Sequence, residues 1–185
     1  MTINCLVHST SIVPNNILSV TKSFIYYQGQ RDADMTRIEY EENISAPVER
    51  VYEYYTNPAN IKEAWPRDVV KESEATTDSK NEPGSEMKVK GEYMGSREEM
   101  RLEVVDKEPN RRLVTRQTEG PFKKWESIQE FEGDNNKTHL RHVIDYELGT
   151  IAKAGNFVAG SQAEDKIKQG LEQAAQTVKQ KLESR

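Results

Sequence analysis

Apolar and polar residues alternate along most of the chain after Met35, in short segments separated by turn residues. In the first segment Ile38, Tyr40 and Ile44 share one face, and charged residues occupy the other. This two-residue period is typical of a strand with one buried face. The same period predicts six further strands, near residues 69–75, 87–93, 99–104, 112–117, 124–131 and 139–148. Because short turns join consecutive strands, an antiparallel meander of about seven strands is the simplest topology.

Helical spacing replaces this alternation in two places. After the first strand, Pro47 and Glu49 are residues that open helices, and the pattern predicts a short helix followed by a second one from Pro58 to about Trp65. Near the end of the chain, an apolar stripe predicts a helix of at least four turns. The stripe consists of Ile167, Leu171, Ala174, Ala175, Val178 and Leu182. Residues 151–161, just before it, fit either a short helix or a loop.

These elements predict an α+β fold in which a curved antiparallel sheet wraps the long C-terminal helix. A strongly twisted sheet cannot lie flat along a helix, so space tends to remain between the two. Small residues on the helix, which are Gly170, Ala174 and Ala175, either let the sheet approach closely or leave room for a ligand. Close packing throughout the interior is the alternative interpretation.

The space predicted between sheet and helix has the composition of a ligand site, mainly apolar with a few polar groups. Gln129, His142 and Tyr146 supply those polar groups on the inner face of the sheet. The residues expected to bind a ligand are Met87, Val89, Tyr93, Met100, Leu102, Trp125, Gln129, His142, Ile144, Tyr146, Phe157, Ile167 and Leu171.

Composition limits the possible partners. The formal net charge of -5 argues against a nucleic-acid surface, which needs clustered Lys and Arg. No apolar stretch approaches the ~20 residues that cross a bilayer, so no integral membrane segment is expected. The single cysteine, Cys5, excludes an intramolecular disulfide and a cysteine-based zinc cluster. This cysteine usage suits a cytoplasmic location.

Residues 1–34 differ from the rest of the chain. Their only formal charges are Lys22, Arg31, Asp32 and Asp34, and they show no regular period. The basic region and unbroken apolar run of a secretory signal are both missing from this segment. We expect either an N-terminal extension that is disordered or loosely docked, or a natural start at Met35. Residues 35–185 are expected to form the folded domain.

Three short motifs resemble one known superfamily. Ile44–Tyr52, with the sequence ISAPVERVY, resembles the strand-to-helix entry of the START / Bet v 1-like superfamily, also described as SRPBCC or polyketide cyclase/dehydrase-like proteins. Asn57–Ile61 resembles the start of the second helix in that superfamily, and Pro83–Ser85 resembles the turn into the third strand. The resemblance covers Met35–Arg185 and implies the helix-grip fold. It names no function, because members include lipid and quinone carriers, hormone receptors, aromatase/cyclases and co-chaperone-like domains.

His142 is the main candidate for chemistry, because alternation points its imidazole inward. There it can hydrogen-bond a ligand carbonyl or act as a general base; a histidine bonded only to a neighbouring polar group is the alternative. His139 lies three residues away and faces the other side of the strand, so the two cannot form a metal site on it. Glu126 and Asp145 fall on outward faces, which disfavours a paired-carboxylate site. No metal and no cofactor are predicted.

The leading hypothesis is binding or transport of a small hydrophobic ligand between the sheet and the C-terminal helix. The resemblance implies a lipid, a quinone or a polyketide-like compound. The first alternative is a cyclase/dehydratase-type enzyme in which His142 is the general base and Tyr146 or Gln129 orients a carbonyl. The second is a co-chaperone-like interaction module, which predicts a large exposed apolar patch and little internal volume.

Overall fold

The structure is a computed structural model that describes residues 35–76, 82–93, 96–149 and 158–184. These residues belong to one compact unit, Asp34–Arg185. The expected N-terminal extension, residues 1–34, lies outside the described residues, so its character stays a prediction. Most of residues 151–161 also lie outside them, and the described helix begins at Val158.

Seven strands form a single antiparallel sheet. They are β1 (Thr36–Ile44), β2 (Val70–Ala75), β3 (Glu86–Tyr93), β4 (Ser96–Glu108), β5 (Arg112–Glu119), β6 (Phe122–Gly133) and β7 (Thr138–Leu148). Their order is β1-β7-β6-β5-β4-β3-β2, so β2 to β7 form the predicted meander and β1 pairs with its last strand. The predicted α+β fold with about seven strands is confirmed.

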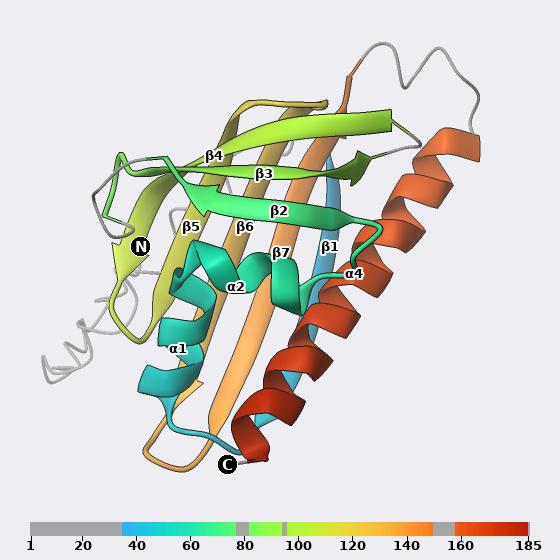
Figure 1. The fold of residues 1–185 in the computed structure, drawn as a ribbon. Helices are drawn as coiled ribbons and strands as arrows, with labels where there is room; N and C mark the ends of the chain where they lie inside the picture. The colour runs from blue at the N-terminus through green and yellow to red at the C-terminus, as the bar shows by residue number, and fades with distance from the viewer. Residues whose placement is uncertain (1–34, 77–81, 94–95, 150–157, 185) are drawn as a thin grey trace, which may run out of the picture. The chain divides into compact units, whose positions relative to one another are not determined.

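The sheet is strongly curled, and β2, β3 and β4 cross the direction of β6 and β7 (Figure 1). Register shifts accompany this curvature in β2 at Val70/Glu72, in β4 at Val104/Asp106 and in β6 at Phe122/Lys124. A bulge inserts an extra residue into one strand, which bends that strand and increases its twist. The curl gives the sheet a concave face, and alternation along each strand selects the residues that point into it.

In the described residues, three helices lie on the concave side, namely α1 (Val48–Thr56), α2 (Pro58–Ala64) and α4 (Val158–Glu183) (Figure 1). Asn57 ends α1 and caps α2, because its side-chain oxygen accepts a hydrogen bond of 3.1 Å from the backbone N–H of Ala59. The 26 residues of α4 make it longer than the four turns that its apolar stripe required. Contacts with β1, α1 and α2 hold α4 in place.

The turns follow the residues that the sequence offered for them. Gly84 has φ 88° and Asn110 has φ 62°, both in the left-handed region. Glycine adopts this region without steric cost, and asparagine tolerates it better than most residues. The Pro83-Gly84 and Pro109-Asn110 dipeptides therefore fix the entries into β3 and β5.

The small residues of α4 allow close approach, one of the two roles that the sequence suggested, and leave no room for a ligand beside them. The space beside Gly170 is filled by the indole of Trp65, and a Cβ added there would lie 2.5 Å from the ring carbon Cζ3. Ala174 and Ala175 are buried in a close-packed cluster with residues of α1, β6 and β7. Close approach at Gly170 is therefore made by the end of α2 rather than by the sheet. None of these three residues lines the space that remains in the interior.

Candidate functional site: a cavity between the sheet and the helices

A cavity of about 120 Å³ lies between the concave face of the sheet and the three helices. Most of its wall is apolar. The sheet contributes Val70, Met87, Val89, Glu92, Met100, Leu102, Leu113, Thr115, Phe122, Trp125, Ser127, Gln129, His142 and Ile144. The helices and the segment after α2 contribute Tyr54, Tyr55, Asn60, Ile61, Ala64, Trp65, Val69, Ala163, Lys166 and Ile167.

Most of the residues expected at this site are in the wall. Met87, Val89, Met100, Leu102, Trp125, Gln129, His142, Ile144 and Ile167 all line the cavity. The strand period identified those on the sheet because it fixes which residues share the concave face, and the helical stripe identified Ile167. Their role in ligand binding stays a prediction.

Two of the expected residues are buried but lie outside the wall. Tyr146 is 2% exposed, and its ring packs 5.7 Å from that of Phe122 and 6.3 Å from that of Trp125. These two rings separate it from the space, although it shares a strand face with His142. Leu171 is 1% exposed within the same hydrophobic cluster. The side chain of Tyr93 and the whole of Phe157 are outside what the structure describes.

The helices supply wall residues that the sequence did not reveal as such. Tyr55 lies on the first short helix, where helical spacing predicted only a buried side, and Trp65 was expected only as the approximate end of the second helix. A stripe shows which side of a helix is buried but not whether it meets another side chain or an empty space. Ser127, by contrast, shares a strand face with the expected residues Trp125 and Gln129, and alternation could have found it. Thr115 shares a face of β5 with Leu113, and both line the cavity although neither was expected to.

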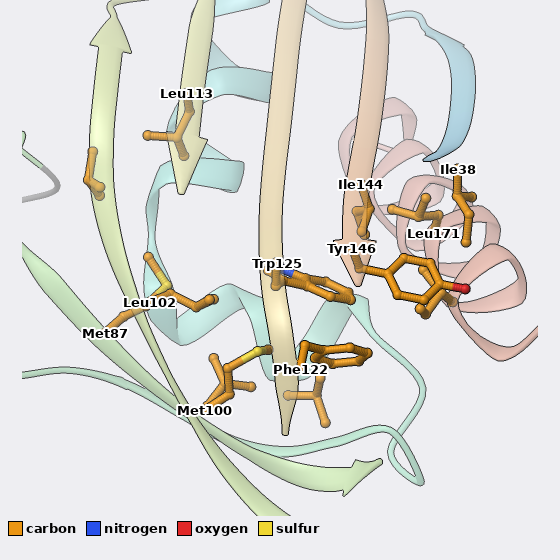
Figure 2. Packing of buried hydrophobic residues seen from close by; sticks show 14 residues of the cluster. Ile38, Met87, Met100, Leu102, Leu113, Phe122, Trp125, Ile144, Tyr146 and Leu171 are labelled. Atoms are coloured by element: carbon orange, nitrogen blue, oxygen red, sulfur yellow. The ribbon is translucent and has the colours of Figure 1, made fainter. Parts of the chain in front are cut away.

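Aromatic rings form one side of the cavity. Trp125 and Phe122 lie with their ring centroids 4.7 Å apart. Figure 2 shows them between Met87, Met100 and Leu102 on one side and Tyr146 and Leu171 on the other. Both methionines belong to the wall, and methionine adapts its shape to irregular neighbours. This side of the cavity therefore offers a broad apolar surface.

Three polar side chains surround His142. Its Nε2 lies 2.8 Å from the Ser127 hydroxyl and 3.5 Å from the amide nitrogen of Gln129, its cross-strand partner. The ring of Tyr55 stands edge-on to the imidazole, with 6.2 Å between their centroids. A hydroxyl both donates and accepts, so the short contact with Ser127 fits either tautomer of the neutral His142 ring.

The polar cluster is formed by Tyr55, Ser127, Gln129 and His142, and its environment disfavours charge. Burial lowers the pKa of the His142 imidazole to about 3, so the ring is neutral at physiological pH. Burial also raises the pKa of the Tyr55 hydroxyl, with smaller contributions from Tyr54 and Tyr40. Tyr55 lies deep in the protein, and the surface that its ring keeps accessible faces the cavity.

The wall also contains two charged residues, Lys166 and Glu92. Lys166 on α4 is exposed, and Glu92 on β3 is half-buried, so both reach solvent. Within the described ranges, no three His, Cys, Asp or Glu side chains gather where they could hold a metal ion. Glu126 and Asp145 lie on the opposite face of the sheet, where each pairs with an arginine. The site is therefore a neutral, mostly apolar cavity.

The fold resembles solved structures from several organisms. TTHA0849 from Thermus thermophilus matches with a TM-score of 0.67 and 19% identity over 80% of this chain and 98% of that one. A START superfamily protein from Mycobacterium smegmatis matches with a TM-score of 0.64 and 16% identity over 80% and 97%. The Zhui aromatase/cyclase from Streptomyces sp. R1128 matches with a TM-score of 0.63 and 18% identity over 82% and 95%. At these identities the likeness establishes the fold alone.

The curled sheet, the long C-terminal helix and the cavity between them define a helix-grip protein, and the family match that follows confirms the START / Bet v 1-like superfamily that the sequence motifs predicted. Within it, residues 45–183 match the model of the family described as "Activator of Hsp90 ATPase homolog 1-like protein", and the chain belongs to this family. Among curated proteins, no sequence matches this chain significantly. In the part of the chain that the structure describes, no helix is long and apolar enough to span a membrane.

Proposed function

We propose that this protein binds a small hydrophobic ligand in the cavity, as a carrier or receptor rather than an enzyme. The main support for this proposal is the cavity between the sheet and the helices, whose wall is mostly apolar. Protein interiors are normally packed to the density of organic crystals. The side chains that line a space of this size therefore lose van der Waals contacts unless another molecule fills it. A ligand with an apolar body restores those contacts.

The volume limits what can be enclosed. An apolar cavity of about 150 Å³ accommodates benzene, whereas pockets for drug-sized molecules span about 300–1,000 Å³. The 120 Å³ available here suits a single ring or a short branched chain. A lipid, a quinone or a polyketide-like compound would place only its end group inside, with the remainder leaving past Lys166 and Glu92.

Solvent extraction and mass spectrometry test this proposal. Protein purified without detergent is extracted, and the extract is compared with that of Ala163→Leu, which adds bulk to the wall. The expected result is one compound, near one per protein, that is depleted from the variant. Gln169→Leu, an exposed change on the same helix, is the control and should keep the compound. Equal recovery from Ala163→Leu, or no ligand bound by the wild type in extraction or direct titration, would refute the proposal.

A cyclase-type enzyme is the second candidate, because His142 opens onto the cavity with Gln129 beside it. The pKa of His142, the proposed general base, argues against this candidate. A general base works best when its pKa is near the operating pH, and burial holds the pKa of His142 near 3. Tyr146 cannot orient a carbonyl there, because it lies outside the wall. Water loss from a short poly-β-carbonyl compound that disappears in His142→Gln would favour the enzyme over the carrier.

An interaction module has less support. Among residues whose side chains the structure describes, no Val, Ile, Leu, Met, Phe, Trp or Tyr is exposed. A large exposed apolar patch was the feature expected of such a module. The described surface therefore favours an internal ligand over a protein partner docked on an apolar face.

A further inference from the structure

Two polar atoms of the polar cluster lack hydrogen-bond partners. The Tyr55 hydroxyl and the side-chain oxygen of Gln129 are both buried, and neither has a partner among the described residues. Both side chains line the cavity and both adjoin His142. A buried polar group without a partner costs about 1–3 kcal/mol, so such groups usually find one.

The positions of these two atoms distinguish them from other buried hydroxyls. Tyr52 also has a buried, unpartnered hydroxyl among the described residues, but its side chain is outside the cavity wall. Tyr54 lines the wall and its hydroxyl is also unpartnered among the described residues, but Tyr54 is not part of the polar cluster, and the ammonium of Lys181 lies over its ring, 5.1 Å from the centroid. Only at Tyr55 and Gln129 do unpartnered atoms coincide with the polar end of the cavity in the described part of the chain.

The two atoms have complementary needs. The Tyr55 hydroxyl can donate a proton, whereas the Gln129 oxygen can only accept one. A hydroxyl group on a ligand accepts the first bond and supplies the second through one atom. An ether or a ketone accepts from Tyr55 but leaves the Gln129 oxygen unpartnered, and a hydrocarbon satisfies neither.

Charged ligand groups are disfavoured at the same place. An isolated charge is costly to bury unless it is paired. The neutral imidazole of His142 offers no positive partner to a carboxylate. The ionisable wall residues Lys166 and Glu92 reach solvent instead of the polar cluster.

We propose that the polar cluster selects an uncharged ligand hydroxyl, that of a phenol or a small alcohol, which accepts from Tyr55 and donates to Gln129. This inference rests on the proposed function, because it assigns the polar group of the ligand that the cavity binds. The apolar part lies against Trp125, Met87 and Met100, and its enclosed size is that of one ring.

Isothermal titration calorimetry with four related probes tests the inference. 4-Methylphenol carries the hydroxyl, 4-methylanisole blocks it with a methyl group, toluene lacks it, and 4-methylbenzoate replaces it with a charge. We expect 4-methylphenol to bind at least about tenfold more tightly than toluene or 4-methylanisole, because each of these leaves a buried polar atom unpartnered. 4-Methylbenzoate should bind most weakly.

Two variants and a matched control test whether Tyr55 and Gln129 cause the preference for 4-methylphenol. Tyr55→Phe and Gln129→Met should each reduce the preference for 4-methylphenol over toluene to about twofold or less, while toluene still binds. Tyr52→Phe removes a buried hydroxyl from the same helix but outside the wall, and should leave the preference unchanged. Thermal unfolding of each variant checks that the fold is retained.

The possible failures can be told apart. If toluene and 4-methylanisole bind the wild type as tightly as 4-methylphenol, the hydroxyl assignment is wrong and the ligand-binding function stands. The hydroxyl assignment is equally wrong if Tyr55→Phe and Gln129→Met, both folded, keep the full preference. If none of the neutral probes binds, the proposed function is wrong, and the hydroxyl assignment is wrong as well because it rests on that function.

Discussion

Replacement of Gly170 by alanine tests how tightly α2 and α4 are fitted together. The added Cβ would lie 2.5 Å from Cζ3 and 2.8 Å from Cε3 of Trp65. Ordinary contacts between carbon atoms are about 3.5–4.0 Å, so the indole must move by roughly 1 Å. An indole is rigid, and it cannot yield by rotating a flexible end.

Two opposing contributions decide how Gly170→Ala changes the free energy of unfolding. Alanine inside a helix is favoured over glycine by about 1 kcal/mol. Overpacking of an interior typically costs about 1–3 kcal/mol. The clash is expected to win, so Gly170→Ala should lower the free energy of unfolding by about 1 kcal/mol. For a domain of this size, that corresponds to a Tm lower by roughly 2–4 °C.

A double-mutant cycle separates these contributions. Urea unfolding is followed by far-ultraviolet circular dichroism for the wild type, Gly170→Ala, Trp65→Leu and the double variant. Because leucine is smaller and flexible, Gly170→Ala should stabilise the Trp65→Leu protein by about 1 kcal/mol, a reversal of sign. Gln169→Ala, at the exposed neighbouring position, serves as the helix control and should change stability by less than about 0.5 kcal/mol.

The reasoning would be refuted if Gly170→Ala stabilised the wild type as much as it stabilises Trp65→Leu. Equal effects in the two backgrounds would mean that the indole does not occupy the space beside Gly170. The arrangement of α2 against α4, and with it this side of the cavity wall, would then be incorrect.

Three further changes have distinct expected outcomes. The leucine side chain of Ala163→Leu projects into the cavity and should change the free energy of unfolding by less than about 1 kcal/mol. That of Ala174→Leu enters a filled cluster and should lower the free energy of unfolding by about 1–3 kcal/mol. Urea unfolding compares the two variants, and equal losses would contradict the placement of the cavity. The pKa of His142 is about 3 in the folded protein and near 6.5 when unfolded, so the unfolded state binds the extra proton and stability falls as pH drops below about 6.5. From pH 7.5 to 5.5 this residue should lower the free energy of unfolding by about 1 kcal/mol, and this loss should be missing from His142→Gln. Identical pH profiles for the two proteins would show that the imidazole is not buried. Gly84→Ala, where no atom lies within 4 Å of the added Cβ, should cost about 1 kcal/mol through its φ of 88° alone, and no change in Tm would argue against that turn.

The sequence predicted the sheet well because a strand pattern is local and periodic. Met87, Val89, Met100 and Leu102 were placed on one wall from alternation alone, and the pairing of β3 with β4 brings them together. The C-terminal helix was predicted for the same reason. The three motifs that resemble the START / Bet v 1-like superfamily then implied the helix-grip fold for the same elements.

The empty part of the interior could not be predicted in the same way. Tyr146 and Ile144 share the face that alternation assigns, yet only Ile144 reaches the cavity, because Phe122 and Trp125 cover Tyr146. Ala163 lines the space while Ala174, on the same helix, is packed. Whether a small residue leaves a void depends on the side chain opposite it, which belongs to a distant part of the sequence. Tyr55 escaped notice for that reason.

The central claim is that a small apolar ligand enters the space between sheet and helices. Nuclear magnetic resonance of protein carrying ¹³C-labelled methionine methyl groups tests it directly, with 4-methylphenol as the ligand. Met87 and Met100 line the cavity, whereas Met35 lies before β1 and outside its wall. The account predicts intermolecular nuclear Overhauser effects from the ligand ring to the methyl groups of Met87 and Met100, and none to Met35. A ligand that binds without contacting Met87 or Met100, or that contacts Met35 instead, would contradict it.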